Sequence, residues 1–251
     1  MVMKKFIVTT ALISLLSVSA VPAFAAEKNQ SSISVQTKIS LDDVKGHWAR
    51  EAIDALVEKG ILQGEDDHHF NPDKLVTREA FAAMVARTFH LKNTSTIQDF
   101  NDVGPKRWSF NVIEATKDYF DRYKSLNEGY NFEPTLGAKR EDVTVTLVKV
   151  LMKQNSSIQL LDAAAAEALL TSKFTDTNSI PEVLRPYVAT AVQNNLIQGD
   201  DQHRFHPNAT LTRAEAATLL YRLLKNNVVV DVPTGNNTNG STVTGNTYGS
   251  N

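Results

Sequence analysis

The apolar residues of this chain recur with the period of a buried helix face in three stretches of similar layout. In each stretch an Asp-containing turn leads into a helix with a narrow apolar stripe, and a turn-rich loop leads to a second helix that begins at an arginine. The stripe residues are Ala52, Ile53, Leu56 and Val57, then Val112, Ile113 and Thr116, and then Val188, Ala191 and Val192. This period is typical of amphipathic helices, so the pattern predicts an all-α, mainly helical fold.

The second helices carry the most apolar residues and are predicted over 78–89, 140–152 and 213–224. Because one stretch alone cannot bury both of its helices, we expect these three to lie together at the centre. Gly60 and Asn195 follow the first helix of their stretches and suit a left-handed cap, and Thr212 with Glu215 forms a capping-box pattern.

Two long phrases show that the stretches are copies of one another. Residues 61–78 read ILQGEDDHHFNPDKLVTR and residues 196–213 read LIQGDDQHRFHPNATLTR, which align without a gap. A divergent copy lies between them, with FNDVGPKRW from Phe100 and FEPTLGAKRED from Phe132, but its loop has lost the glycine pattern and gained two residues. Internal similarity of this kind predicts tandem structural repeats. We place them at 41–92, 97–155 and 173–226, with a connecting helix at 156–172 packed on the outside.

The first 25 residues have the parts of a secretory signal peptide. Lys4 and Lys5 precede an apolar run, and a small-x-small site ends at Ala25, so we predict export and cleavage after Ala25. A membrane anchor is the alternative, but hydroxyl side chains dilute the run and Pro22 ends it early. The polar segments 26–40 and 227–251 have little to bury and are predicted to be a flexible lead-in and a disordered tail.

Composition narrows the classes of function. The sequence has no cysteine, so an exported form would be stabilised without disulfides. Its 26 basic and 28 acidic side chains give a formal net charge of −2, which argues against a general nucleic-acid binder. We also expect no membrane association after removal of the signal segment.

The copies resemble the surface-layer homology (SLH) domain family. The motifs that carry the resemblance are Asp43-Val44, Trp48, Ala52-Ile53, Gly60-Ile61, Gly64, Phe70-x-Pro72 and Thr77-Arg78-Glu79-Ala80, with FTD, LIQGDD and LTRAEA in the third copy. The resemblance implies a pseudo-three-fold arrangement of three repeats around a central three-helix bundle, with grooves between neighbouring copies. It also implies non-covalent anchoring to a bacterial cell wall through secondary cell-wall polysaccharide, often through a sugar that carries a pyruvate ketal.

The resemblance further implies a set of ligand-binding residues. Carried over position by position, they are Arg78, Arg140, Arg213, Asp43, Asp102, Asp176, Trp48, Trp108, Gly64 and Gly199. This chain departs from the family pattern in three places: Val183 replaces the third tryptophan, Lys139-Arg140-Glu141-Asp142 replaces T-R-A-E, and the middle loop lacks its glycines. Not all three grooves need be competent.

An arginine at a helix start favours a nearby anion, because the helix dipole alone disfavours a cation there. A guanidinium can grip a planar carboxylate with two hydrogen bonds, and free backbone N–H groups of the first turn would add donors. We therefore expect Arg78 to be an exposed cation whose loss weakens binding with little effect on stability. The alternative is that the arginines pair with aspartates of a neighbouring copy and only hold the repeats together. Each tryptophan is either a platform for a sugar ring or an edge of the core.

The acidic residues and histidines of 65–69 suggest a metal site at first sight. His68 matches His203, but His69 matches Arg204 in the third copy, and the spacing differs from a calcium loop. We interpret the run as a solvated turn and expect no metal or other cofactor.

The leading functional hypothesis is a non-catalytic cell-wall anchoring module at the cell surface. Its expected partner is secondary cell-wall polysaccharide, and other surface-layer proteins remain open as partners. One alternative is a self-assembling surface-layer component. Another is a cell-wall hydrolase that uses Asp66 and Asp67, but adjacent carboxylates lack the separation across a cleft that glycoside hydrolysis needs.

Overall fold

The computed structural model describes residues 41–225. The predicted signal peptide, lead-in and tail lie outside these residues. Within the described part, no helix combines the length and the apolar character needed to span a membrane.

The described residues form seven α-helices, a short hairpin and three 3₁₀ turns. The helices are α1 (Arg50–Glu58), α2 (Arg78–Thr88), α3 (Phe110–Thr116), α4 (Arg140–Gln154), α5 (Ala163–Lys173), α6 (Arg185–Gln193) and α7 (Arg213–Lys225). Strands β1 (Tyr123–Lys124) and β2 (Tyr130–Asn131) pair antiparallel. The 3₁₀ turns cover Asp42–Val44, Thr177–Ser179 and Glu182–Leu184. The all-α prediction is confirmed.

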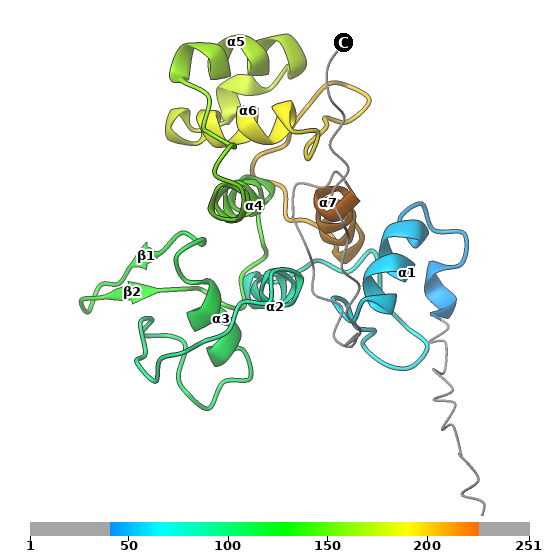
Figure 1. Cartoon of the computed structure of the whole chain (residues 1–251), viewed down its shortest axis with the longest axis vertical. Coiled ribbons are helices and arrows are strands. Elements are labelled where there is room, and N and C mark those ends of the chain that lie inside the picture. The colour runs from blue at the N-terminus through cyan, green and yellow to red at the C-terminus, as the bar shows by residue number, and fades with distance from the viewer. Residues whose placement is uncertain (1–40, 226–251) are drawn as a thin grey trace, which may run out of the picture. The chain divides into compact units, whose positions relative to one another are not determined.

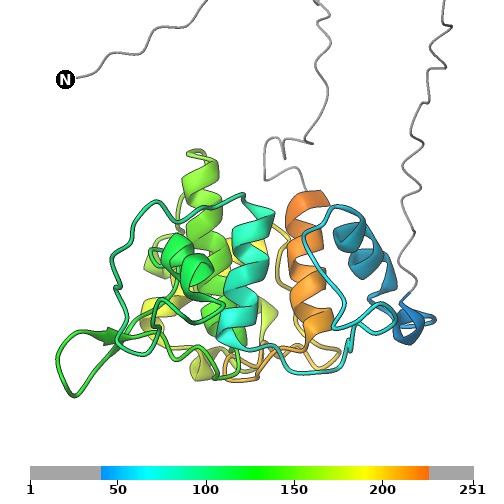
Figure 2. The ribbon, with the colours of Figure 1, turned by 90° about the horizontal axis from the view of Figure 1, so that it is seen from below.

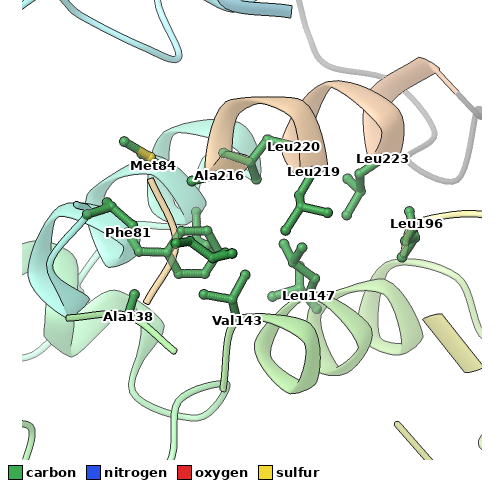
Figure 3. Close-up of a cluster of buried hydrophobic side chains, with 14 of the residues drawn as sticks. Phe81, Met84, Ala138, Val143, Leu147, Leu196, Ala216, Leu219, Leu220 and Leu223 are labelled. Carbon is green, nitrogen blue, oxygen red and sulfur yellow. The ribbon is translucent and has the colours of Figure 1, made fainter. Parts of the chain in front are cut away.

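Three helices, α2, α4 and α7, lie at the centre, as predicted from their apolar content (Figure 1). Side chains from all three meet in one buried cluster, in which Phe81, Leu147 and Leu220 are each no more than 1% exposed (Figure 3). Buried positions on α2 run from Arg78 to Thr88 with few gaps, which is the pattern of a helix that is covered on most sides.

The segments that lead into the central helices close a ring of backbone hydrogen bonds. Val76 donates to the Leu211 carbonyl at 2.9 Å, Leu211 donates to Ala138 at 3.0 Å, and Ala138 donates to Val76 at 2.9 Å. Each segment thus donates to one neighbour and accepts from the other, which is the hydrogen-bond pattern of a three-fold assembly made from one chain. The ring fixes the starting points of α2, α4 and α7 relative to one another.

Each outer helix packs on a central helix from a different copy. α1 contacts α7, α3 contacts α2, and α6 contacts α4, while α5 covers α6 (Figures 1 and 2). A hydrogen bond of 2.6 Å from the Tyr221 hydroxyl to Glu51 joins α7 to α1. The first and last copies are therefore in contact, and the ring of copies is closed.

The predicted helix boundaries hold for the central helices and less well for the outer ones. Helix α5 falls in the segment predicted as a connecting helix over 156–172, but it begins only at Ala163. Helices α1, α3 and α6, with 9, 7 and 9 residues, are shorter than the roughly 12 residues predicted for the first helix of each copy. Gly60 (φ 69°) and Asn195 (φ 58°) are left-handed, as predicted. The capping box is also confirmed, since Thr212 N–H donates to Glu215 Oε2 at 2.8 Å and Glu215 N–H donates to Thr212 Oγ1 at 3.1 Å.

The β1–β2 hairpin occupies the divergent loop of the middle copy and was not predicted from the sequence. Its turn uses two left-handed residues, Glu128 (φ 63°) and Gly129 (φ 72°). Strands of two residues are too short to produce an alternating apolar pattern, so periodicity gives no signal for them.

Candidate functional site

The aspartate near the start of each copy holds the loop of the same copy. The Asp43 carboxylate accepts hydrogen bonds from the backbone N–H groups of Phe70 at 2.9 Å and Asn71 at 2.6 Å. The equivalent contacts join Asp102 to Phe132 and Glu133 at 2.8 and 2.7 Å, and Asp176 to Phe205 and His206 at 2.8 and 2.8 Å. An ionised acceptor makes such bonds stronger than neutral ones. The three aspartates therefore fix the loop backbone, a role that the sequence alone did not reveal.

The loops share further backbone features. The residue after each clamped phenylalanine is left-handed, with φ of 55° at Asn71, 57° at Glu133 and 58° at His206. A Cβ on Gly64 would lie 2.4 Å from the Asp66 carbonyl oxygen, and one on Gly199 would lie 3.0 Å from the Phe174 ring. Gly64 is thus required by close packing inside its own loop, whereas Gly199 packs tightly against Phe174, which follows α5.

Arg78 is a buried side chain with 1% exposure, so the expectation of an exposed cation is wrong for it. Its Nε donates to the Phe132 carbonyl at 2.8 Å and its Nη2 donates to the Asp121 carbonyl at 2.9 Å. Nη1 lies 3.3 Å from Asp142 Oδ2, and the guanidinium lies 4.8 Å from the Tyr123 ring centre. The sequence missed this burial because all the partners lie in the next copy.

Arg213 occupies the equivalent place between the third and first copies. Its Nε donates to the Phe70 carbonyl at 2.8 Å, and its Nη2 donates to the Gln63 carbonyl at 3.0 Å. Burial lowers the pKa of Arg213 from its ordinary value. Within residues 41–225 it forms no ion pair, in contrast to Arg78.

Arg140 departs from the other two. Its Nη2 donates to Glu215 Oε1 at 2.5 Å, while its Nε is buried without a hydrogen-bond partner among the described residues. By alignment, the carbonyl that corresponds to those of Phe70 and Phe132 is that of Phe205. Arg140 instead turns towards α7, which leaves a donor without an acceptor.

The helix-start N–H groups are occupied, so the expectation that they are free donors is wrong for the first two of each central helix. In α2 the N–H of Arg78 donates to the Leu136 carbonyl at 2.8 Å and that of Glu79 donates to the Pro134 carbonyl at 3.0 Å. The equivalent donors of α4 bind Ala209 and Pro207, and those of α7 bind Lys74 and Pro72. The F-x-P segments thus supply acceptors to the helix of a neighbouring copy.

A groove of about 230 Å³ lies beside Arg140. It is lined by Trp48 before α1, by the loop that contains Gly199 and His206, and by Glu215 and Arg222 on α7. Residues from all three copies therefore line the groove, and the packing of α1 on α7 brings Trp48 to it.

Two cations dominate the electrostatics of this groove. Burial lowers the pKa of Arg222, and the positive charge of Arg140 lowers it further. Arg222 has no ion-pair partner in the described part of the chain, and Glu215 alone pairs with Arg140. Asp200, the acid of the loop, already accepts hydrogen bonds from Arg204 and His206, which hold the pKa of that carboxyl far below its usual range. The groove thus has a surplus of guanidinium groups and suits an anion.

The two tryptophans are exposed. Trp48 is 65% exposed and Trp108 is 63% exposed, which argues against the core-edge interpretation. Val183, the aligned residue of the third copy, is also exposed but offers no aromatic face. An exposed ring at the edge of a groove is suited to stack against a sugar ring.

The acidic loop of the first copy is organised by its own backbone. Asp66 accepts hydrogen bonds from the N–H groups of His68 at 2.8 Å and His69 at 2.7 Å. Across residues 41–225, no group of three or more His, Cys, Asp or Glu side chains is placed to hold a metal ion.

Comparison with known proteins bears on the identity of the copies. A family model described as the S-layer homology domain matches residues 40–82 and 173–217. The chain is 30% identical over 189 residues to the amylopullulanase of Thermoanaerobacterium thermosulfurigenes, which covers 74% of this chain and 10% of that protein. It is 29% identical over 194 residues to exoglucanase XynX of Acetivibrio thermocellus, or 76% of this chain and 17% of that protein.

A further relative is the surface-layer 125 kDa protein of Lysinibacillus sphaericus, 27% identical over 231 residues, or 89% of this chain and 17% of that protein. The chain thus spans between a tenth and a fifth of the length of these three relatives. The first and third copies match the S-layer homology domain, which agrees with the resemblance inferred from their motifs.

Proposed function

We propose that this chain is a non-catalytic cell-wall anchoring module that binds secondary cell-wall polysaccharide in the grooves between its copies. The observation that carries the proposal is the groove beside Arg140, near the exposed ring of Trp48. In it, the buried Nε of Arg140 and the cation Arg222 both lack a partner among the described residues. A sugar that bears a carboxylate would bind the two cations through its carboxylate and the Trp48 ring through its apolar face.

The chemistry favours a planar carboxylate such as that of a pyruvate ketal. Arg140 has donors on one edge of its guanidinium that such a group can accept in parallel. Arg222 would add a second positive charge, and Trp48 would cover an apolar face of the sugar. Glu215, which is fixed by its capping bond to Thr212, would hold the Arg140 guanidinium in the groove.

The relatives support a module that is shared by proteins with different main bodies. The amylopullulanase is named for an enzyme activity and the surface-layer 125 kDa protein for its location, yet each matches this chain over a small part of its own length. A common segment in such proteins is more readily explained by a common location than by a common reaction. We extend the proposal to export by the signal peptide at 1–25 and to the middle copy as a third, divergent repeat with the boundaries given above.

Binding to purified cell-wall sacculi tests this function. We expect the protein without residues 1–25 to sediment with sacculi, and to stay in solution after the non-peptidoglycan polymer has been removed. Arg140→Ala should lower the bound fraction at least tenfold, because it removes the principal carboxylate donor. Arg50→Ala is the matched control, since Arg50 is an exposed arginine on α1 that pairs with Asp54.

Three other outcomes would contradict the proposal. Equal binding before and after removal of the polymer would exclude the polysaccharide as the ligand. Ordered self-assembly without wall material would favour the surface-layer alternative. Clearing of wall material in a zymogram would favour a hydrolase.

A further inference from the structure

His206 is the one histidine among the described residues that line the groove beside Arg140. Its side chain is 40% exposed, and its Nε2 lies 2.8 Å from Asp200 Oδ2. The hydrogen bonds from His206 and Arg204 hold the pKa of the Asp200 carboxyl far below its usual range, so this group is ionised and can only accept. In the neutral ring the proton must therefore sit on Nε2. The other ring nitrogen, Nδ1, forms no hydrogen bond within residues 41–225.

Protonation would change what this ring offers to a ligand. A neutral ring presents a lone pair at Nδ1, which repels the oxygen of an anion. A protonated ring presents an N–H donor and a positive charge, which attract that oxygen. Histidine is the side chain that ordinarily changes its charge between about pH 5 and 8, whereas arginine stays charged and ordinary carboxyl groups are ionised in this range.

The other charged groups around His206 are already paired or permanently charged. They are Asp200 and Arg204 on its own loop, Asp176, which binds its backbone N–H, Arg140 on α4, and Glu215 and Arg222 on α7. Glu215 lies 2.5 Å from Arg140, and Asp200 lies 2.9 Å from Arg204. Between about pH 8 and 5, the charge of the groove should thus change at His206.

The equivalent position of the first copy shows that the loop does not need a histidine there. Asn71 aligns with His206 and has nearly the same left-handed backbone, with φ of 55° against 58°. Its Nδ2 donates to Glu65 Oε2 at 2.7 Å, and Glu65 aligns with Asp200. An amide thus joins the first loop to its acid as the imidazole joins the third. The histidine adds a second nitrogen, which can take up a proton.

We propose that His206 is a further ligand-binding residue of the Arg140 groove, which holds an anionic sugar in its protonated form and makes binding tighter as the pH falls. This inference rests on the proposed function, because it takes the wall polysaccharide as the ligand. One added charge a few ångströms from the ligand, in a partly exposed groove, should change the affinity about three- to tenfold. The gain is present at the acid end of the range and is lost as the ring gives up its proton. Linkage then requires that binding is accompanied by proton uptake.

Calorimetric titration at about pH 5.5 and about pH 8 tests the inference on the protein without residues 1–25. The probe is the methyl glycoside of a pyruvylated N-acetylhexosamine, whose carboxylate is ionised at both pH values. We expect the wild type to bind at least about threefold more tightly at the lower pH. His206→Asn introduces the side chain that the first copy has at this place. Its affinity should be the same at both pH values to within about 1.5-fold.

Two controls separate the ring of His206 from other effects of pH. His203 is exposed on the same loop, with a left-handed φ of 57°, and does not line the groove. His203→Asn should therefore keep the full pH dependence. The second control measures proton uptake at about pH 6.5, from the binding heats in two buffers of different ionisation enthalpy. The wild type should take up protons on binding, and His206→Asn should take up none.

The outcomes separate this inference from the function on which it rests. Failure of the wild type to bind sacculi and the glycoside at either pH would remove the proposed function and the role of His206 with it. Binding to sacculi with an affinity for the glycoside that is independent of pH, or higher at about pH 8, would overturn the role of His206 alone. Binding by the wild type without proton uptake, or a pH dependence that survives in the folded His206→Asn variant, would also overturn it.

Discussion

Asp43 and Arg213 bind opposite ends of the same residue, Phe70. The Asp43 carboxylate accepts from the Phe70 N–H at 2.9 Å, and Arg213 Nε donates to the Phe70 carbonyl at 2.8 Å. The aspartate of the first copy thereby positions the acceptor for an arginine of the third copy. Asp102 and Arg78 are related in the same way through Phe132.

This relationship predicts that Asp43 and Arg213 are energetically coupled. Asp43→Asn and Arg213→Lys should each lower the free energy of unfolding by about 2 kcal/mol, because each removes hydrogen bonds to a charged group. In a double-mutant cycle measured by urea unfolding, we expect a coupling energy of about 1 kcal/mol. Asp176→Asn with Arg140→Lys is the control pair, since Arg140 is bound to Glu215, and it should be additive. Equal coupling in both pairs would show that the Phe70 connection is not the cause.

Arg78 is predicted to be a determinant of stability. Arg78→Ala should lower the free energy of unfolding by about 3 kcal/mol, because it leaves Asp142 and the Phe132 carbonyl without their donor. Arg140→Ala should change the same quantity by less than about 1 kcal/mol, since its ion pair is partly exposed. Chemical denaturation of both variants measures the contrast. A similar loss in both would argue that the two arginines are equivalent after all.

Glu141 is predicted to give the protein a local dependence on pH. It is 7% exposed, and its Oε2 has no hydrogen-bond partner in the described part of the chain. Burial raises the pKa of Glu141 above its ordinary value of 4.5, the nearby Asp142 and Asp121 raise it further, and Lys139, whose Nζ lies 3.9 Å away, partly offsets this. The folded state therefore binds this proton more tightly than the unfolded state does. The resulting stabilisation is complete below about pH 4.5 and is lost as the pH rises through the raised pKa.

Glu141→Gln removes this dependence. We expect the variant to be more stable than the wild type by about 1 to 3 kcal/mol at pH 8, with the difference vanishing near pH 4, as measured by urea unfolding at each pH. Glu79→Gln is the matched control, because Glu79 binds Arg107 and Ser109 and should lose stability at pH 8. In the third copy, Glu182 and Leu184 align with Arg107 and Ser109, so Glu141 is not offered the donors that Glu79 has. A destabilised Glu141→Gln variant at pH 8 would contradict the prediction.

Gly137 is predicted to be essential for closing the backbone ring. A Cβ at this position would lie 2.5 Å from Thr210 Cγ2, so Gly137→Ala should lower the free energy of unfolding by about 1 to 3 kcal/mol. Adding Thr210→Ala should restore part of this loss in thermal or urea unfolding. Gly104→Ala is the control, because a Cβ there would meet no atom within 4 Å. Equal effects of the two glycine variants would refute a steric cause.

Local patterns were sufficient to predict most of the secondary structure. The apolar period located α2, α4 and α7, and the caps at Gly60, Asn195 and Thr212 follow from conformational preferences of residues close together in the sequence. The family resemblance pointed to Trp48, Arg140 and Gly199, which line the groove, but not to its other charged residues Arg204, His206, Glu215 and Arg222. The helices and caps depend on interactions within about one turn of helix or one loop, which the sequence displays directly.

The pairing of the copies and the state of each arginine were decided only by the tertiary structure. Nothing in the local pattern of α1 indicates that it packs on α7, since the contact joins the two ends of the described chain. Arg78, Arg140 and Arg213 align, yet Arg78 is buried beside the hairpin, Arg140 turns to Glu215, and Arg213 donates to the carbonyls of Phe70 and Gln63. The difference arises because each guanidinium finds its acceptors in another copy, where the acid, the ring and the length of the loop are not the same.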